Sequence, residues 1–362
     1  MPTIEIILPP QRYAIHIAAG NLRRLGELVR AVVPQTRAAL LMDGNVAGRF
    51  GAVATEALRG AGYEVCAGEL VPGEAHKTLD AVRALYDVLL NARLERRSPV
   101  IALGGGVTGD TVGFAAATYL RGVPLVQCPT TLLAMVDSSV GGKVGVDVPQ
   151  GKNLIGAFYQ PRLVVVDPDT LGTLPARELR CGLAECVKHA VIRDAALFDW
   201  MDVNLARIQQ LDSATLVELI RRNVEIKAKV VMADEKETGE RAHLNFGHTF
   251  GHALETVTGY GKYHHGEAVA LGMLVATRLA VALRRCDPAL LPKLAGLLTR
   301  IGLPTRDREL PSTASLWNAM RSDKKVAEGT MRFVLPERLG GVGLYQDIPP
   351  AAVQQAWDCL RA

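Results

Sequence analysis

The residues best suited to chemistry are histidines, because five of the chain's eight fall between residues 243 and 265. Histidine titrates near neutral pH and is the commonest metal ligand in proteins. His248 and His252 are four residues apart and Glu255 follows three residues later, so a helix would place two imidazoles and a carboxylate on one face. Such a face can hold a divalent metal ion or line a polar pocket without one. The spacing alone leaves both open, since a zinc site needs a further ligand.

A glycine-rich loop is the second candidate site. The run PVIALGGGVTGD places Gly104, Gly106 and Gly109 in Gly-x-Gly-x-x-Gly register after an apolar run and before a helical one. In that setting glycines let the backbone approach a pyrophosphate, and the following helix offers free N–H groups. The acidic residue expected about 20 positions downstream is missing, so tight strand-to-helix packing is the alternative. Asp43, at the end of AALLMD, offers a different anchor for a ribose.

Lysines in glycine-rich or apolar surroundings indicate an anion pocket. Residues 129–160 combine glycine turns with Lys143 and Lys152, whose ammonium groups suit phosphate. Lys188 follows Glu185 by three residues on an apolar helix, where a structural ion pair is the alternative. Further lysines in such positions are Lys227, Lys324 and Lys325.

Composition bounds the class of protein. The chain of 362 residues is long enough for two or three domains, and its net charge of +4 is too small to indicate a nucleic-acid or membrane surface. Six cysteines form no Cys-x-x-Cys pair, and the N-terminus shows no secretory signal. The longest uncharged stretch, residues 122–136, is short and contains two prolines, so we expect no membrane span and a cytoplasmic location.

The pattern of apolar runs predicts which elements position these residues. In the first half, short β-rich runs such as AALLMD, PVIAL and LVVVD alternate with helical ones, which predicts an α/β domain with a mainly parallel, Rossmann-like sheet. Beyond about residue 170 the runs are long and helical in period, with MRFVLPE as the only late strand. We therefore expect domains at residues 1–172 and 173–362, the second mainly α-helical, with a ligand in the cleft between them.

Taken in order, the motifs resemble those of the 3-dehydroquinate synthase family of sugar phosphate cyclases. The matching stretches run from about residue 43 to 325 and are PGEAHKT, GGGVTGD, LRGVP, PTTLLAMVDSSVGGK, GKNLIGAF, TLPARE, GLAECVKH, residues 234–267 and DKK. The resemblance implies an N-terminal domain that binds NAD+ and a helical C-terminal domain that holds a divalent metal ion, zinc or cobalt. It also implies a homodimer.

The resemblance assigns a role to individual residues. The metal ligands would be Glu185, His248 and His265, while His252 would serve the substrate as an acid/base or hydrogen-bonding group. NAD+ would contact Asp43, Asn45, Glu74, Lys77, Gly105, Gly106, Thr108, Asp110, Thr130, Thr131, Asp137, Ser138, Lys143, Lys152 and Thr173. The substrate would contact Arg121, Lys143, Lys152, Asn153, Lys188, Lys227, Arg241, Asn245, His252 and either Lys324 or Lys325. His264 receives no role.

The implied reaction converts 3-deoxy-D-arabino-heptulosonate 7-phosphate into 3-dehydroquinate and phosphate, in the shikimate pathway to aromatic amino acids. It combines transient oxidation by NAD+, phosphate elimination, re-reduction, ring opening and aldol closure. Other sugar phosphate cyclases, metal-dependent polyol dehydrogenases and a non-catalytic nucleotide-binding paralogue are the alternatives. Arg121, Lys227, Glu237, Arg241 and Asn245 favour a carboxylated substrate. The departures from the family pattern at Cys186, Val144 and Asp147 remove no proposed ligand.

Overall fold

The computed structural model describes residues 1–259, 261–321 and 331–361, and it divides the chain into two compact units. The first comprises Met1–Leu174 and Leu211–Glu235, and the second comprises the remainder. The helix α8 (Ser213–Ala233) thus belongs to the first unit, where it packs on β1 (Thr3–Leu8). The expected boundary between domains at residue 172 remains a prediction. By that boundary α8 would belong to the second domain, whereas it groups with the first unit.

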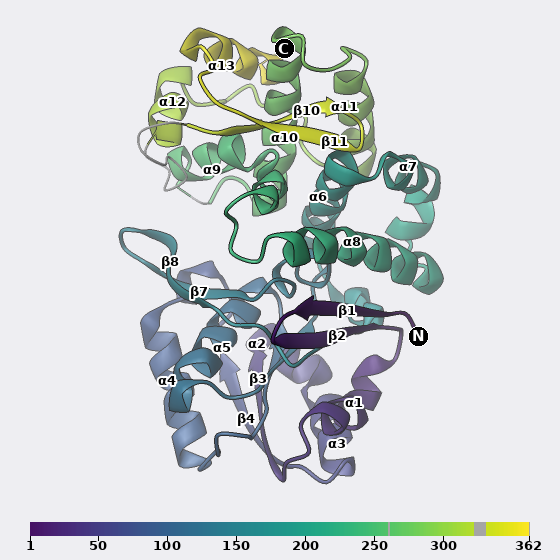
Figure 1. The fold of residues 1–362 in the computed structure, drawn as a ribbon, viewed down its shortest axis with the longest axis vertical. Helices are drawn as coiled ribbons and strands as arrows, with labels where there is room; N and C mark the ends of the chain where they lie inside the picture. Colours follow the sequence, from purple (N-terminus) through teal and green to yellow (C-terminus); the bar gives the residue numbers. More distant parts are fainter. Residues whose placement is uncertain (260, 322–330, 362) are drawn as a thin grey trace. The chain divides into compact units, whose positions relative to one another are not determined.

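A seven-stranded sheet forms the centre of the first unit (Figure 1). Apart from the antiparallel pair of β1 and β2, neighbouring strands are parallel, so the predicted α/β class is confirmed. The strands in spatial order are β1, β2 (Gln11–Ile17), β9 (Leu163–Val166), β6 (Leu125–Pro129), β5 (Val100–Gly104), β3 (Arg37–Asp43) and β4 (Glu64–Leu70).

Helices cover both faces of this sheet because successive strand residues point to opposite sides. Leu40 and Met42 of β3 pack in the core beneath α1 (Leu25–Val32) and α3 (Ala52–Gly60). Ala39 and Leu41 pack in a second core. The helices over that second face are α4 (Leu79–Asn91) and α5 (Gly106–Thr118), as Figure 1 also shows.

An antiparallel hairpin of β7 (Lys143–Val148) and β8 (Gly151–Phe158) occupies a segment in which we expected only glycine-rich turns. Gly145 and Gly156 face each other across it, and a Cβ on either would lie 2.6 Å or less from a backbone oxygen of the other strand. The glycines therefore permit close strand pairing here. Sequence alone did not separate this use from a flexible turn.

The second unit is mainly helical, as predicted. Its helices are α6 (Ala176–Arg193), α7 (Ala195–Gln209), α9 (His248–Val257), α10 (His265–Ala282), α11 (Leu290–Ile301), α12 (Thr313–Arg321) and α13 (Pro350–Ala356). The expectation of a single late strand was wrong, because β10 (Phe333–Arg338) pairs with β11 (Gly341–Tyr345). In the described part of the chain, α10 alone is long and apolar enough to cross a membrane, but it is 72% buried, as a core helix is.

Candidate active site

The three predicted metal ligands lie close together in the second unit, two at the start of a helix and one within a helix. Glu185 lies within α6, while His248 and His265 are the first residues of α9 and α10. One ligand atom from each lies within 4.8 Å of the other two. The structure therefore collects one carboxylate and two imidazoles from segments up to 80 residues apart in the sequence.

The orientation of the imidazoles leaves acceptor atoms facing one another. His248 Nδ1 lies 3.2 Å from the carbonyl oxygen of Phe246, and His265 Nδ1 lies 3.5 Å from Glu255 Oε1. With Nδ1–H donating to these oxygens, both Nε2 atoms carry lone pairs, and they lie 3.8 and 3.7 Å from Glu185 Oε1. Lone pairs at such distances repel each other unless a cation lies among them. This donor set fits a divalent metal ion.

Glu185 has the environment expected of a buried ligand. Its side chain is 1% exposed, and its Oε1 accepts no hydrogen bond from any residue that the structure describes. Its other oxygen, Oε2, forms an ion pair with Lys188 Nζ one turn along α6. Because an uncompensated buried carboxylate is costly, Oε1 is suited to a cation.

Glycines bring His248 to this place. Gly247, before α9, has a φ of 80° in the left-handed region that favours glycine. A Cβ on Gly272 of α10 would lie 2.0 Å from the Gly247 carbonyl oxygen, so α9 and α10 pack with almost no space between their backbones. Close packing of these two helices sets the distance between His248 and His265.

Electrostatics at His265 also favour positive charge. Burial works to lower the pKa of His265, but the hydrogen bond and charge of Glu255, together with the charge of Glu185, outweigh it and leave the pKa raised. Glu255 is itself 5% exposed. The sequence placed Glu255 on the helix face of His248 and His252, and the family resemblance gave it no role. Only the structure puts it beside His265.

His252 lies in the same cluster, one turn after His248. Its ring centroid is 5.5 Å from that of His248 and 6.1 Å from that of His265. His252, Glu255 and His265 also offer ligand atoms within 4.8 Å of one another, which is a second possible triad overlapping the first. The division between His248 as metal ligand and His252 as substrate group thus stays a prediction.

In the first unit, the predicted NAD+ contacts gather at one edge of the sheet. The strands β3, β5 and β6 are adjacent and parallel, so their carboxyl ends meet at that edge. Residues at or after these ends include Asp43, Asn45, Gly105, Gly106, Thr108, Thr130, Thr131, Asp137 and Ser138. Thr173 follows β9, which pairs with β6. The edge is where open α/β sheets bind their ligands.

The glycine loop lies against two of these side chains. A Cβ on Gly105 would be 3.1 Å from Thr131 Cγ2, and one on Gly106 would be 3.2 Å from Ser138 Oγ. Within the loop itself, a Cβ on Gly104 would be 2.5 Å from Thr108 Oγ1. The glycines therefore allow tight packing. Binding of a phosphate group at the N-terminus of α5 stays a prediction.

A buried lysine connects α5, the helix after the glycine loop, to the hairpin of β7 and β8. Lys77 is 3% exposed, and its Nζ lies 2.6 Å from Asp110 Oδ2 and 2.5 Å from Asn153 Oδ1. Burial works to lower the pKa of Lys77, but the charges of Asp110 and Glu74 and the hydrogen bond that Lys77 donates to Asp110 leave it raised. Lys152 lies 3.6 Å from Glu74. Five residues predicted to contact cofactor or substrate thus form one charged network.

Lys227 forms a second charged contact within the first unit. It is 5% exposed on α8 and donates to Asp137 Oδ1 at 2.6 Å and to the Asp137 carbonyl oxygen at 2.5 Å. This contact is one of several by which α8 packs in the first unit, although the sequence placed it in the helical half. Lys143 begins β7 of the nearby hairpin segment.

Two further predicted substrate residues lie in the second unit. Arg241 is 3% exposed, and Asn245 donates to Glu237 Oε1 at 2.7 Å. Both belong to the short helix at Glu240–Asn245, just before α9. These predicted substrate residues therefore lie just before the histidines of α9 in the sequence.

Not every predicted residue joins these groups. Arg121 is exposed after the C-terminus of α5, at the sheet edge opposite the glycine loop. Lys324 and Lys325 lie outside the described residues. Asp147, which the sequence analysis treated as a minor departure from the family pattern, accepts a 2.7 Å hydrogen bond from the backbone N–H of Asn153. The φ of Asn153 is 52°. No local pattern distinguished Asp147 before the hairpin was known.

Among the solved structures that resemble the whole fold, two have NAD+ and a metal ion bound. One is 2-epi-5-epi-valiolone synthase from Streptomyces hygroscopicus, which has NAD+ and Zn2+ bound; the TM-score is 0.90, the identity is 28%, and 98% of each chain is covered. The other is 2-deoxy-scyllo-inosose synthase complexed with carbaglucose-6-phosphate, NAD+ and Co2+, with a TM-score of 0.87, 26% identity and coverage of 98% and 99%.

Sequence comparison gives the family. The model of the 3-dehydroquinate synthase N-terminal region matches residues 68–181, and that of the C-terminal region matches residues 182–326. A 3-dehydroquinate synthase of Gloeobacter violaceus is 46% identical over 361 residues, with 100% of both chains covered. The predicted resemblance is therefore confirmed, and the chain belongs to the 3-dehydroquinate synthase family.

Proposed function

We propose that this chain converts 3-deoxy-D-arabino-heptulosonate 7-phosphate into 3-dehydroquinate and inorganic phosphate. The observation that carries the proposal is the set of three facing acceptor atoms at Glu185, His248 and His265, in a chain that matches this family over its full length. The overall conversion eliminates phosphate and closes a carbocycle without net oxidation. Bound NAD+ would therefore supply a hydride acceptor that is regenerated within each turnover.

The side chains that would hold the two cofactors lie in different units. Glu185, His248 and His265 would hold Zn2+ or Co2+, the metals named in the related cyclase structures, and such an ion polarises an alcohol or carbonyl oxygen. The glycine loop and the carboxyl edge of the sheet would hold NAD+, which accepts and returns a hydride. Asp43, whose carboxylate accepts from the Asn45 backbone at 2.8 Å, would bind a ribose hydroxyl.

Basic residues match the two anionic groups of this substrate. Lys152 is about one-third exposed and can reach a phosphate, and Asn153 is held beside it by its contacts to Lys77 and Asp147. In the second unit, Arg241 can pair with a carboxylate in the bidentate way that guanidinium groups favour. Lys188 forms an ion pair with Glu185 and so helps to hold the carboxylate in place.

Proton transfer at the substrate is assigned to His252. An imidazole accepts or donates a proton near neutral pH, which suits the steps in which hydroxyl and carbonyl groups interconvert. His252 lies close to His248 and His265, so it can reach a substrate oxygen held in the same cluster. The phosphate of the substrate can itself take the proton that is lost during elimination.

Phosphate release from the heptulosonate phosphate tests the proposed function. We expect release by the protein loaded with metal and NAD+, and loss of release after chelation with recovery on adding Zn2+ or Co2+. If properly metallated protein releases no phosphate, the assignment is wrong. Undiminished release after complete removal of metal would contradict the role of Glu185, His248 and His265.

The family resemblance also leads us to propose a cytoplasmic homodimer that acts on a small molecule and binds neither nucleic acid nor membrane. Arg121 is exposed and follows the C-terminus of α5, whereas the glycine loop lies at its N-terminus. The sheet of this chain therefore does not bring Arg121 to the predicted substrate residues Lys152 and Asn153. Sedimentation equilibrium of the purified protein tests the oligomeric state, and a monomer at micromolar concentration would contradict it.

A further inference from the structure

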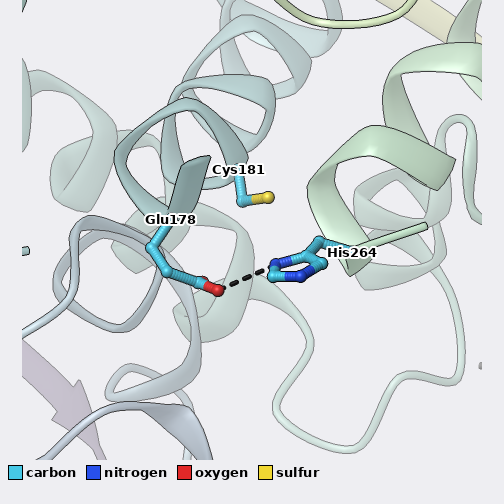
Figure 2. Close-up of side chains that lie close together, drawn as sticks. All are labelled: Glu178, Cys181 and His264. Atoms are coloured by element: carbon cyan, nitrogen blue, oxygen red, sulfur yellow. Dashed lines mark ion pairs between the residues drawn. The ribbon is translucent and has the colours of Figure 1, made fainter. Parts of the chain in front are cut away.

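A second group of metal-ligating side chains lies at the start of α6 and α10. Figure 2 shows Glu178, Cys181 and His264 directed toward a common region. One ligand atom from each lies within 4.8 Å of the others, and His264 Nδ1 is 2.8 Å from Glu178 Oε1. None of these residues has a part in the proposed reaction.

The fold builds this group from two helix ends. Glu178 and Cys181 are three residues apart, so they lie on the same side of α6. His264 is the residue immediately before α10, and its position is fixed because its backbone N–H donates to Glu267 Oε2 at 2.9 Å. A Cβ on Gly266 would lie 2.4 Å from Cys181 Cα. That close approach is what brings His264 beside the thiol.

The three side chains differ in access to solvent in a way that suits a metal ion. Cys181 is 2% exposed, whereas the side chains of Glu178 and His264 are 41% and 38% exposed. A cation can therefore enter from solvent, meet the sulfur at the bottom of the site and keep a water molecule as fourth ligand. Zinc bonds of about 2.0 to 2.3 Å require the ligand atoms to approach to roughly 3.5 Å. Rotation of the two exposed side chains can supply this change.

Without a cation the thiol is protonated. Burial and the charges of Glu178 and Glu267 raise the pKa of Cys181 to about 12, although the backbone amides of Gly266 and Glu267 oppose the shift. The same carboxylates that disfavour a bare thiolate attract a divalent cation. On binding, the S–H bond breaks, sulfur forms a bond to the metal, and one proton passes to solvent. His264 would bind the metal through a ring nitrogen that carries no proton.

We propose that Glu178, Cys181 and His264 form a second metal site, which takes a thiophilic divalent cation such as Zn2+ and clamps the start of α6 to the start of α10. Carboxylate, thiolate and imidazole are the three side-chain ligands that zinc accepts. The site differs from Glu185, His248 and His265 in containing sulfur. That difference allows the two to be observed separately.

Titration of the metal-free, full-length protein with Co2+ tests this proposal, because a cobalt–thiolate bond gives a near-ultraviolet charge-transfer absorption that carboxylate and imidazole ligands lack. We expect two equivalents per chain and this absorption in the unaltered protein. Cys181→Ser should lose the absorption and one equivalent while phosphate release remains. His264→Gln, at a partly exposed position, should weaken binding of the sulfur-dependent equivalent at least about 10-fold.

Two further variants separate this inference from the proposed function. Cys128→Ser removes another buried thiol, in β6 of the first unit, and should keep the absorption. His248→Ala should lose the sulfur-free equivalent and phosphate release but keep the absorption. A single equivalent without thiolate absorption in the unaltered protein would overturn the second site, and so would an absorption that persists in Cys181→Ser.

Discussion

At the residue scale, the two histidines that stand out in the sequence, His248 and His252, have different predicted roles. His248 directs Nε2 toward Glu185, because its Nδ1 is taken by the Phe246 carbonyl oxygen. His252 lies beside it but belongs to a different possible triad, with Glu255. Separate substitutions can therefore distinguish a ligand from a neighbour.

Replacing His252 should impair turnover and leave the metal in place. For His252→Ala we expect metal content within error of the unaltered protein, measured by elemental analysis, and a fall in kcat of about 100- to 10,000-fold, the range for loss of a general acid or base. His248→Ala is the matched comparison and should lose metal. A metal-free His252→Ala protein would show that the division between the two histidines is incorrect.

Glu255 should act through His265 rather than on substrate. Its Oε1 is 3.5 Å from His265 Nδ1, so it orients the ring and increases the basicity of Nε2. We expect Glu255→Gln to weaken metal binding about 10- to 100-fold, measured by competition with a chelating dye. Glu218→Gln, on α8 of the first unit, serves as control. Unchanged metal affinity in Glu255→Gln would contradict this positioning role.

At the element scale, the backbone contact between α9 and α10 sets the geometry of the histidines. A Cβ on Gly272 would lie 2.0 Å from a carbonyl oxygen, whereas one on Gly296 of α11 would meet nothing within 4 Å. Gly272→Ala should destabilise the protein by about 1 to 3 kcal/mol through overpacking. Gly296→Ala should stabilise it by about 0.5 to 1 kcal/mol, because alanine favours the helix.

Urea unfolding of both glycine variants measures these two effects, and metal content reports whether the histidines have moved. We expect Gly272→Ala to lose metal affinity as well as stability. Equal stability of the two variants would mean that α9 and α10 do not pack as closely as described.

The segment before α10 is also held by a carboxylate that should make stability depend on pH. Asp307 lies 2.8 Å from Lys262 Nζ and accepts a hydrogen bond from Tyr263. Burial works to raise the pKa of Asp307, but these two partners outweigh it and leave the pKa below its ordinary value of 3.8. Its contribution to stability is therefore complete above pH 3.8 and is lost as pH falls through the lowered value.

Replacing the carboxylate should remove this part of the pH dependence. We expect Asp307→Asn to be less stable than the unaltered protein at pH 6 and to lose less stability on further acidification, measured by thermal unfolding between pH 6 and pH 3. Parallel curves for the two proteins would show that Asp307 gains nothing from Lys262 and Tyr263 in the folded state.

The elements differ in how well sequence predicted them. The buried strands β3, β5, β6 and β9 were recognisable because apolar runs between helical segments indicate a parallel sheet. The hairpin of β7 and β8 was not, because Gly145 and Gly156 resemble turn residues until their pairing is known. The late strand β11 was not predicted, because its two glycines resemble turn residues and gave no sign of its pairing with β10.

At the scale of the whole molecule, the site had to be assembled from distant segments, which limits what spacing alone can reveal. The histidine run was visible as a metal candidate, but its third ligand, Glu185, is 63 residues before His248. Only the family resemblance joined them, and the structure then brought their atoms together. Contacts such as Lys77 with Asn153, and Lys227 with Asp137, likewise depend on tertiary packing.

Recycling of NAD+ within each turnover is the central feature of the proposed function, and the ratio of phosphate released to NAD+ supplied tests it most directly. With metallated protein, excess heptulosonate phosphate and NAD+ at one-hundredth of the substrate concentration, we predict nearly complete phosphate release without accumulation of NADH. NADH that accumulates in proportion to substrate consumed, with phosphate retained, would identify a dehydrogenase and contradict the account.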